Sequence, residues 1–125
     1  MKRQNFTRRP GCAVEATLDL IDGKWKGVIL FHLQGGTQRF GELRKRMPGI
    51  TQRMLTKQLR ALEIDRLVIR KVYAEVPPRV EYTLSETGES LRPVIDTLRA
   101  WGENHQANLS CGPEPEIIEA PYRAA

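Results

Sequence analysis

The chain has 125 residues, 40% of them hydrophobic, and its 20 lysines and arginines exceed its 15 aspartates and glutamates, for a net charge of +5. This length fits one domain, and no apolar run approaches the roughly 18 residues of a membrane span. The basic N-terminus lacks a following apolar segment, so we expect a cytoplasmic protein. Two scattered cysteines and two scattered histidines have no metal-site spacing, so we expect neither a metal nor another cofactor.

The two ends of the chain differ in composition from its middle. Residues 1–11 are predicted to form a flexible basic arm, and the proline-rich residues 108–125 a flexible tail. Between them, 12–107 is predicted to be the folded domain. It opens with helices over 13–21 and 24–33, and in the second of these we expect four side chains to face inward: Trp25, Val28, Ile29 and Leu33.

Glycine and proline set the next boundaries. The Gly-Gly pair at 35–36 ends the second helix, and a brief extended piece at 38–40 leads into a helix over 41–47. The Pro-Gly pair at 48–49 ends that helix, because proline lacks a backbone donor and glycine tolerates unusual backbone angles.

The next helix, predicted over 51–64 with Thr51 as its N-cap, has two contrasting faces. At about 100° per residue, its leucines gather on one wall and its basic residues on the opposite one. The apolar wall is built to be buried, which leaves the basic wall to meet water or an anion. The leucines are Leu55, Leu59 and Leu62, and the opposite wall carries Arg53, Thr56, Lys57 and Arg60.

The second half of the domain reads as a hairpin and a long helix. Residues 67–73 and 80–84 alternate like strands around a turn with two prolines. Ser85 then caps a helix that runs to about residue 106, and Pro93 should kink or loosen its early part. Apolar residues recur along this helix at spacings of three and four: Leu91, Val94, Ile95, Leu98 and Trp101.

This order of elements is that of a winged helix-turn-helix, a mainly α fold with a small β-hairpin wing. A protruding helix about 12 Å wide fits the major groove of DNA. We therefore predict that the 51–64 helix enters the groove and that the hairpin over about 67–84 forms the wing. Expected groove contacts are Gln52, Arg53, Thr56 and Lys57, and expected phosphate contacts are Arg39, Lys45, Arg60 and Arg79.

Charge supports a polyanionic partner without requiring one. Between Arg39 and Arg60 there are seven basic residues and one acid, Glu42. Such a patch favours nucleic acid, because each neutralised phosphate releases counterions. On charge alone, a basic face that only meets solvent is about as well supported, and for Arg79 the same alternative stands.

Four segments together resemble the HxlR family of bacterial transcriptional regulators, winged-helix relatives of the MarR group. They are GKWK at 23–26, RFGELRK at 39–45, PGITQRMLTKQLRALE at 48–63 and VPPRVEYTL at 76–84. The resemblance covers residues 12 to about 102. It implies a homodimeric DNA-binding regulator whose N- and C-terminal helices form the subunit interface, with an inverted-repeat operator. The implied interface residues are Leu18, Leu91, Val94, Ile95, Leu98 and Trp101.

Cys12 stands where many members of that family carry an N-terminal cysteine, although Ala13 follows it here where proline is common. In several members this cysteine senses oxidants, quinones or aldehydes. Arg8, Arg9 and a helix N-terminus would favour the reactive thiolate. We hypothesise that Cys12 senses redox state or a small electrophile, against the alternative that it only packs. Cys111 is interpreted as an incidental exposed thiol.

Enzyme chemistry has little support in the sequence. The glycines at 35–36 lack the downstream glycine and lysine of a phosphate-binding loop, and Asp19 and Asp22 resemble capping or solubilising residues rather than a paired acid and base. The remaining alternative to a DNA-binding regulator is a winged-helix module that uses its basic face to bind a protein.

Overall fold

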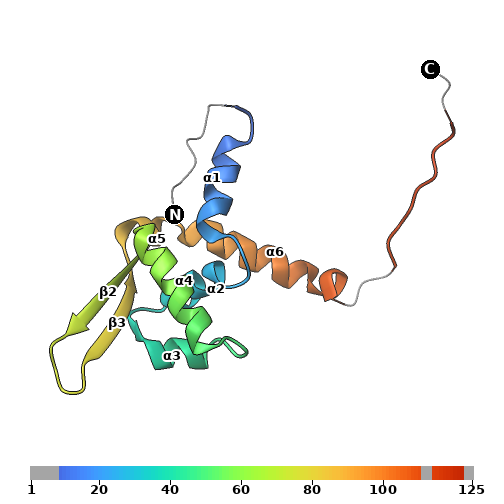
Figure 1. Ribbon diagram of the computed structural model, residues 1–125. Helices are drawn as coiled ribbons and strands as arrows, with labels where there is room; N and C mark the ends of the chain where they lie inside the picture. The colour runs from blue at the N-terminus through green and yellow to red at the C-terminus, as the bar shows by residue number, and fades with distance from the viewer. Residues whose placement is uncertain (1–8, 111–113, 123–125) are drawn as a thin grey trace.

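The computed structural model describes residues 9–110 and 114–122 and shows helices gathered around a small sheet, with one long helix projecting from the domain (Figure 1). The predicted class, mainly α with a β wing, is confirmed. The elements in chain order are α1 (Cys12–Ile21), α2 (Lys26–Leu33), β1 (Gln38–Arg39), α3 (Phe40–Lys45), α4 (Gln52–Ile64), β2 (Val68–Tyr73), β3 (Arg79–Leu84), α5 (Glu86–Ser90) and α6 (Arg92–Ser110).

The hydrophobic core lies where α2, α3, α4, the sheet and the start of α6 meet. Each fully buried leucine or isoleucine stabilises the fold by about 1.5–3 kcal/mol relative to an exposed one. Within α2, Ile29 and Leu33 are buried as predicted and Trp25 is half-buried, but Val28 is exposed. The prediction for Val28 is wrong because α2 is apolar on nearly every side, so periodicity does not define its inner face.

Two residues, Gly49 and Thr51, determine the turn between α3 and α4. Gly49 adopts a left-handed φ of 91°, which few side chains tolerate. Thr51 then caps α4, because its Oγ1 accepts a hydrogen bond from the backbone N–H of Met54 at 3.0 Å. The predicted helix, its cap and its turn are confirmed, and together they fix the direction in which α4 leaves the core.

The sheet contains three antiparallel strands in the order β1-β3-β2. In β2 and β3, Val68 pairs with Leu84 and Tyr73 with Arg79, so the hairpin projects beyond the core as a wing. The short predicted extended piece becomes β1, where Gln38 pairs with Tyr82. The wing is thereby tied to the segment that enters α3.

The C-terminal helical region differs from the prediction. Ser85 caps only the short α5, accepting from the N–H of Gly88 at 3.0 Å, and α6 begins separately after Leu91. The physical reason is Pro93, which has no N–H to continue the hydrogen-bond ladder toward Glu89 and whose ring would clash with that turn. Pro93 instead occupies the first turn of α6, where a missing donor costs nothing.

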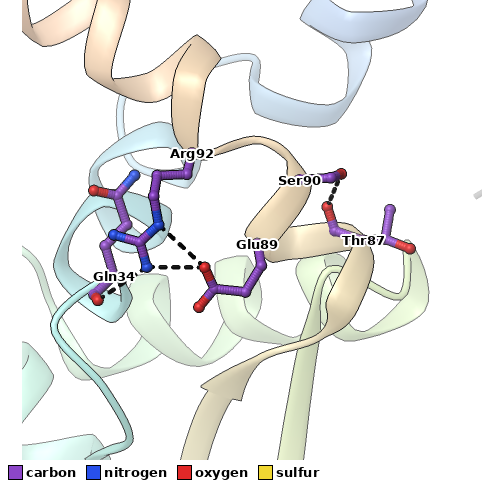
Figure 2. Close-up of polar contacts among 5 residues, drawn as sticks. All are labelled: Gln34, Thr87, Glu89, Ser90 and Arg92. Carbon is purple, nitrogen blue, oxygen red and sulfur yellow. Dashed lines mark hydrogen bonds and ion pairs between the residues drawn. The ribbon is translucent and has the colours of Figure 1, made fainter.

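Arg92 fastens this joint to the core, as Figure 2 shows. Its Nη2 donates to the backbone carbonyl of Gln34 at 3.2 Å and to Glu89 Oε2 at 2.8 Å. The carbonyl belongs to the C-cap of α2. Arg92 therefore holds the base of α6 against the end of α2, with Glu89 balancing its charge.

A second joint connects α5 to the start of β2. Ser85 Oγ donates to the carbonyl of Arg66 at 2.7 Å, and the N–H of Ser85 donates to the carbonyl of Leu67 at 3.0 Å. Gly88 packs so close to this strand that an added Cβ would lie 2.2 Å from the Leu67 oxygen. Only glycine fits there without displacing the backbone.

The ends of the chain remain largely outside this description. Residues 1–8 of the predicted arm are not among the described residues, and 114–122 of the predicted tail are exposed and without helix or strand. The flexibility of both ends and the domain limits stay predictions. In the part of the chain that the structure describes, no helix combines the length and the apolar character needed to cross a membrane.

Candidate nucleic-acid interface

Helix α4 presents its basic face to solvent because its opposite face is fully used by the core. Leu55, Leu59 and Leu62 are buried, whereas Arg53, Lys57 and Arg60 are exposed. Helical periodicity alone produces this separation. The structure thus brings three of the predicted DNA-contacting residues onto one outward surface.

The first two turns of α4 add two polar residues to this surface. Gln52 is exposed and is the first residue of the helix. Thr56 is half-buried, and its hydroxyl donates to the Gln52 carbonyl at 2.9 Å. That hydrogen bond fixes the side chain and occupies the hydroxyl donor, so the contacts we expect from Thr56 are through its methyl group, which suits a thymine.

Residues at α3 extend the basic surface. Arg39 and Lys45 are exposed, at the N-cap and the last residue of α3. The backbone N–H of Arg39 donates to Glu42 Oε1 at 2.9 Å, which fixes the start of the helix. Arg44 and Arg46 are also exposed. We did not single out these two from the sequence, although they belong to the same basic run and are further candidates.

Arg79 is held against the wing. Its guanidinium lies 3.8 Å from the centre of the Tyr73 ring, and its Nη2 is 3.2 Å from Glu75 Oε1. Arg79 and Arg39 both line a hollow of about 520 Å³ between the start of α3 and the wing tip. A phosphate contact from Arg79 would therefore require it to share or exchange its ion pair with Glu75.

His32 lies outside this surface and is half-buried in α2. Burial, with a smaller contribution from the nearby Arg46, lowers the pKa of its imidazole below 6.5. The side chain is therefore neutral at neutral pH. A half-buried, neutral imidazole of this kind is typical of a histidine that packs within its own chain.

Cys12 is the first residue of α1 and is half-buried. Arg9, which was expected to favour its thiolate, donates instead to Glu15 Oε2 at 2.7 Å. Arg9 is therefore engaged in an ion pair with a residue of α1. Arg8, which entered the same hypothesis, and Cys111, interpreted as an incidental thiol, lie outside the described residues.

The residues expected at a subunit interface divide into two groups. Leu91 and Ile95 are buried within this chain's own core, at 9% and 4% exposure, so their assignment to an interface is corrected, because little of either side chain is left for a partner. Leu18, Val94, Leu98 and Trp101 are exposed. They form an apolar stripe along α6, with Leu18 on α1.

Comparison with known proteins places this fold and surface in a family. The family model for HxlR-like helix-turn-helix proteins matches residues 20–110. An uncharacterised HTH-type transcriptional regulator of Bacillus subtilis, YdeP, is 57% identical over 99 residues, which are 79% of this chain and 77% of YdeP. The family match covers the helix-turn-helix, the wing and α6.

Two solved structures are also similar. The redox regulator HypR in its reduced form is 52% identical with a TM-score of 0.75, covering 78% of this chain and 96% of HypR. The reduced form of the transcriptional regulator YodB from B. subtilis is 34% identical with a TM-score of 0.65, covering 87% and 100%; YodB has also been solved after diamide treatment. With its winged helix-turn-helix and outward basic helix, the chain belongs to the HxlR family of DNA-binding transcriptional regulators.

Proposed function

We propose that the protein is a homodimer that binds a specific operator by inserting α4 into the major groove and placing the wing along the backbone. The observation that supports the proposal is the packing of α4 against the core. Its leucines are buried, so its exposed Arg53, Lys57 and Arg60 are held on a rigid element. A helix that the core already fixes loses little backbone entropy on binding, which favours specific readout over a merely attractive charge.

Dimerisation rests on the exposed apolar side chains of α1 and α6. Contiguous exposed apolar residues on a small domain are typical of an interaction surface. A twofold dimer would place two copies of α4 about 34 Å apart, one turn of duplex, so the operator should be an inverted repeat. The four exposed residues named for the stripe are the proposed interface.

Binding is tested by fluorescence anisotropy on the DNA upstream of the protein's own gene and its neighbours, at two salt concentrations. We expect binding at least roughly 10³-fold tighter than to scrambled DNA, with a steep loss at higher salt from released counterions. Binding without sequence preference, or with little salt dependence, would contradict the proposal and favour the protein-interaction module.

We further propose that oxidation or alkylation of Cys12 changes DNA binding. Its position at the start of α1 supports this, because a modification there would disturb a helix assigned to the interface. HypR, similar over most of its length, is a redox regulator. A change in the packing of α1 would alter the spacing between the two copies of α4.

The test compares wild type with Cys12→Ser before and after diamide or a quinone, and Cys111→Ser is the matched control. We expect treatment to change operator affinity in the wild type and in the control, but not in Cys12→Ser. Identical responses of Cys12→Ser and wild type would remove Cys12 from the mechanism while leaving DNA binding intact.

A further inference from the structure

An apolar groove of about 370 Å³ lies between α2, the α1–α2 turn and α6, away from α4. Val28 and Phe31 of α2 form one side and Ile95 and Leu98 of α6 the other. Val28 and Phe31 remain 38% and 37% exposed although they stand beside the core. Large side chains left open in this way indicate a surface that another apolar group covers.

A matching apolar group projects from the same helix. Trp101 is 54% exposed, one turn beyond Leu98 on the stripe of α6. Its ring stacks on His105 with centroids 4.3 Å apart, and the His105 Nδ1 lies 2.8 Å from the Trp101 carbonyl oxygen. The stack restrains the indole, so it extends from the helix as a defined projection.

Symmetry relates the groove to this projection. In a twofold dimer, one patch of surface meets its own copy. The exposed residues of the stripe on α6 are Val94, Leu98 and Trp101, so its centre lies near Leu98. Two antiparallel copies of α6 would therefore bring Trp101 of one subunit opposite Val94 of the other, next to Ile95, which lines the groove. A parallel arrangement would instead set Trp101 against Trp101 and groove against groove. Only the antiparallel arrangement fills both grooves.

We propose that the partner's Trp101 fills the groove formed by Val28, Phe31 and Leu98, reciprocally in both subunits; this inference rests on the proposed homodimer. Size agrees, because 370 Å³ is the volume of about twelve waters, enough for the ten heavy atoms of a tryptophan side chain. Close approach is allowed at Gly102, where an added Cβ would meet nothing within 4 Å. Buried tryptophans at the centre of an interface are frequent hot spots.

The inference gives α2 two roles. One face of α2 contributes Ile29 and Leu33 to the core on which α4 is seated, and the other contributes Val28 and Phe31 to the groove. The partner's tryptophan would therefore be separated from the DNA-binding core by the thickness of one helix.

Trp25→Phe leaves Trp101 as the sole tryptophan, so its fluorescence reports directly on the groove. In the dimer we expect blue-shifted emission and several-fold weaker acrylamide quenching than after dilution to monomer. Val28→Arg in this background should red-shift the emission and weaken dimerisation at least tenfold. Ile69→Arg is the matched control, because Ile69 is an exposed apolar residue on the wing, and it should change neither.

Light scattering on the same samples separates the possible failures. A dimer whose Trp101 emission is that of exposed indole, or does not respond to Val28→Arg, overturns this inference and leaves the dimer standing. A monomer at micromolar concentration overturns the proposed dimer and the inference with it. Circular dichroism identifies any variant that fails to fold.

Cross-linking tests the arrangement without relying on the Val28→Arg variant. In a background with Cys12→Ser and Cys111→Ser, the pair Val28→Cys and Trp101→Cys should form disulfides between subunits on oxidation. Efficient cross-linking by Trp101→Cys alone would show the parallel arrangement and overturn the inference.

Discussion

Helices α4 and α6 are both amphipathic, yet they use their apolar faces differently. The leucines of α4 are completely covered within the chain, whereas α6 buries Ile95 to 4% and leaves Leu98 53% exposed. An apolar stripe in a sequence therefore says that a helix face will be covered, but not by what. Here α4, whose apolar face is covered within the chain, carries the proposed DNA-binding surface, and α6, whose apolar face stays partly exposed, is the helix proposed to contact a partner.

The largest expected effect on stability comes from weakening the packing of α4 against the core. Leu59→Ala should lower the free energy of unfolding by about 2–5 kcal/mol, because a buried side chain is replaced by a cavity. Leu98→Ala, made at a protein concentration low enough to give monomer, should cost far less. Urea unfolding of both variants measures the contrast, and equal losses would mean that the two faces are equally buried.

The anchoring of α5, the short helix before α6, is tested at Gly88. Gly88→Ala places a methyl group 2.2 Å from the Leu67 carbonyl oxygen and should destabilise the fold by about 1–3 kcal/mol or more. Thermal unfolding measures the loss. Gly27→Ala is a suitable control, because an added Cβ there meets nothing within 4 Å, and a similar loss in both would contradict the close packing.

The outward face of α4 is tested by binding rather than stability. Arg53→Ala should weaken operator binding by about 1–3 kcal/mol and relax preference at one base pair, if Arg53 reads a guanine. Because the side chain is exposed, unfolding should be unchanged. Anisotropy on operators altered one position at a time distinguishes readout from a backbone contact, which would weaken binding to all sequences equally.

The smallest expected effect is at the start of α4. Thr51→Ala removes the acceptor for the Met54 N–H and should cost about 1 kcal/mol of stability. Thr51→Ser keeps that acceptor and should recover most of the loss. Urea unfolding of the pair checks this, and an equal loss in Thr51→Ser would show that the methyl group of Thr51, rather than its hydroxyl, stabilises the turn.

Where the sequence predicted the structure well, several local signals agreed. For α4, the leucine spacing, the Thr51 cap and the preceding Pro-Gly pair all specify the same helix. For the region after Ser85, the signals conflicted. The cap at Ser85 favoured one long helix, whereas Pro93, which cannot continue the hydrogen-bond ladder toward Glu89, ends the first helix at Ser90.

The candidate site was predictable on α4 and less so elsewhere. Helical periodicity places Arg53 and Lys57 outward without knowledge of the rest of the fold. The surroundings of Arg79 depend on Tyr73 across the hairpin, and no local pattern reveals that stacking. The burial of Leu91 and Ile95 likewise depends on α2, which the spacing within α6 does not show.

The Arg92 joint also determines how motion would pass through the molecule. Helix α6 has 19 residues and is therefore about 28 Å long at 1.5 Å per residue, and Arg92 fastens one end of it to the C-terminus of α2. Such a helix acts as a lever. A rotation of about 5° at the base would shift the far end by about 2.5 Å, following from that length. In the proposed dimer, small adjustments between the two subunits would thus reach the domain as tilts of α2, and through the core would reorient α4.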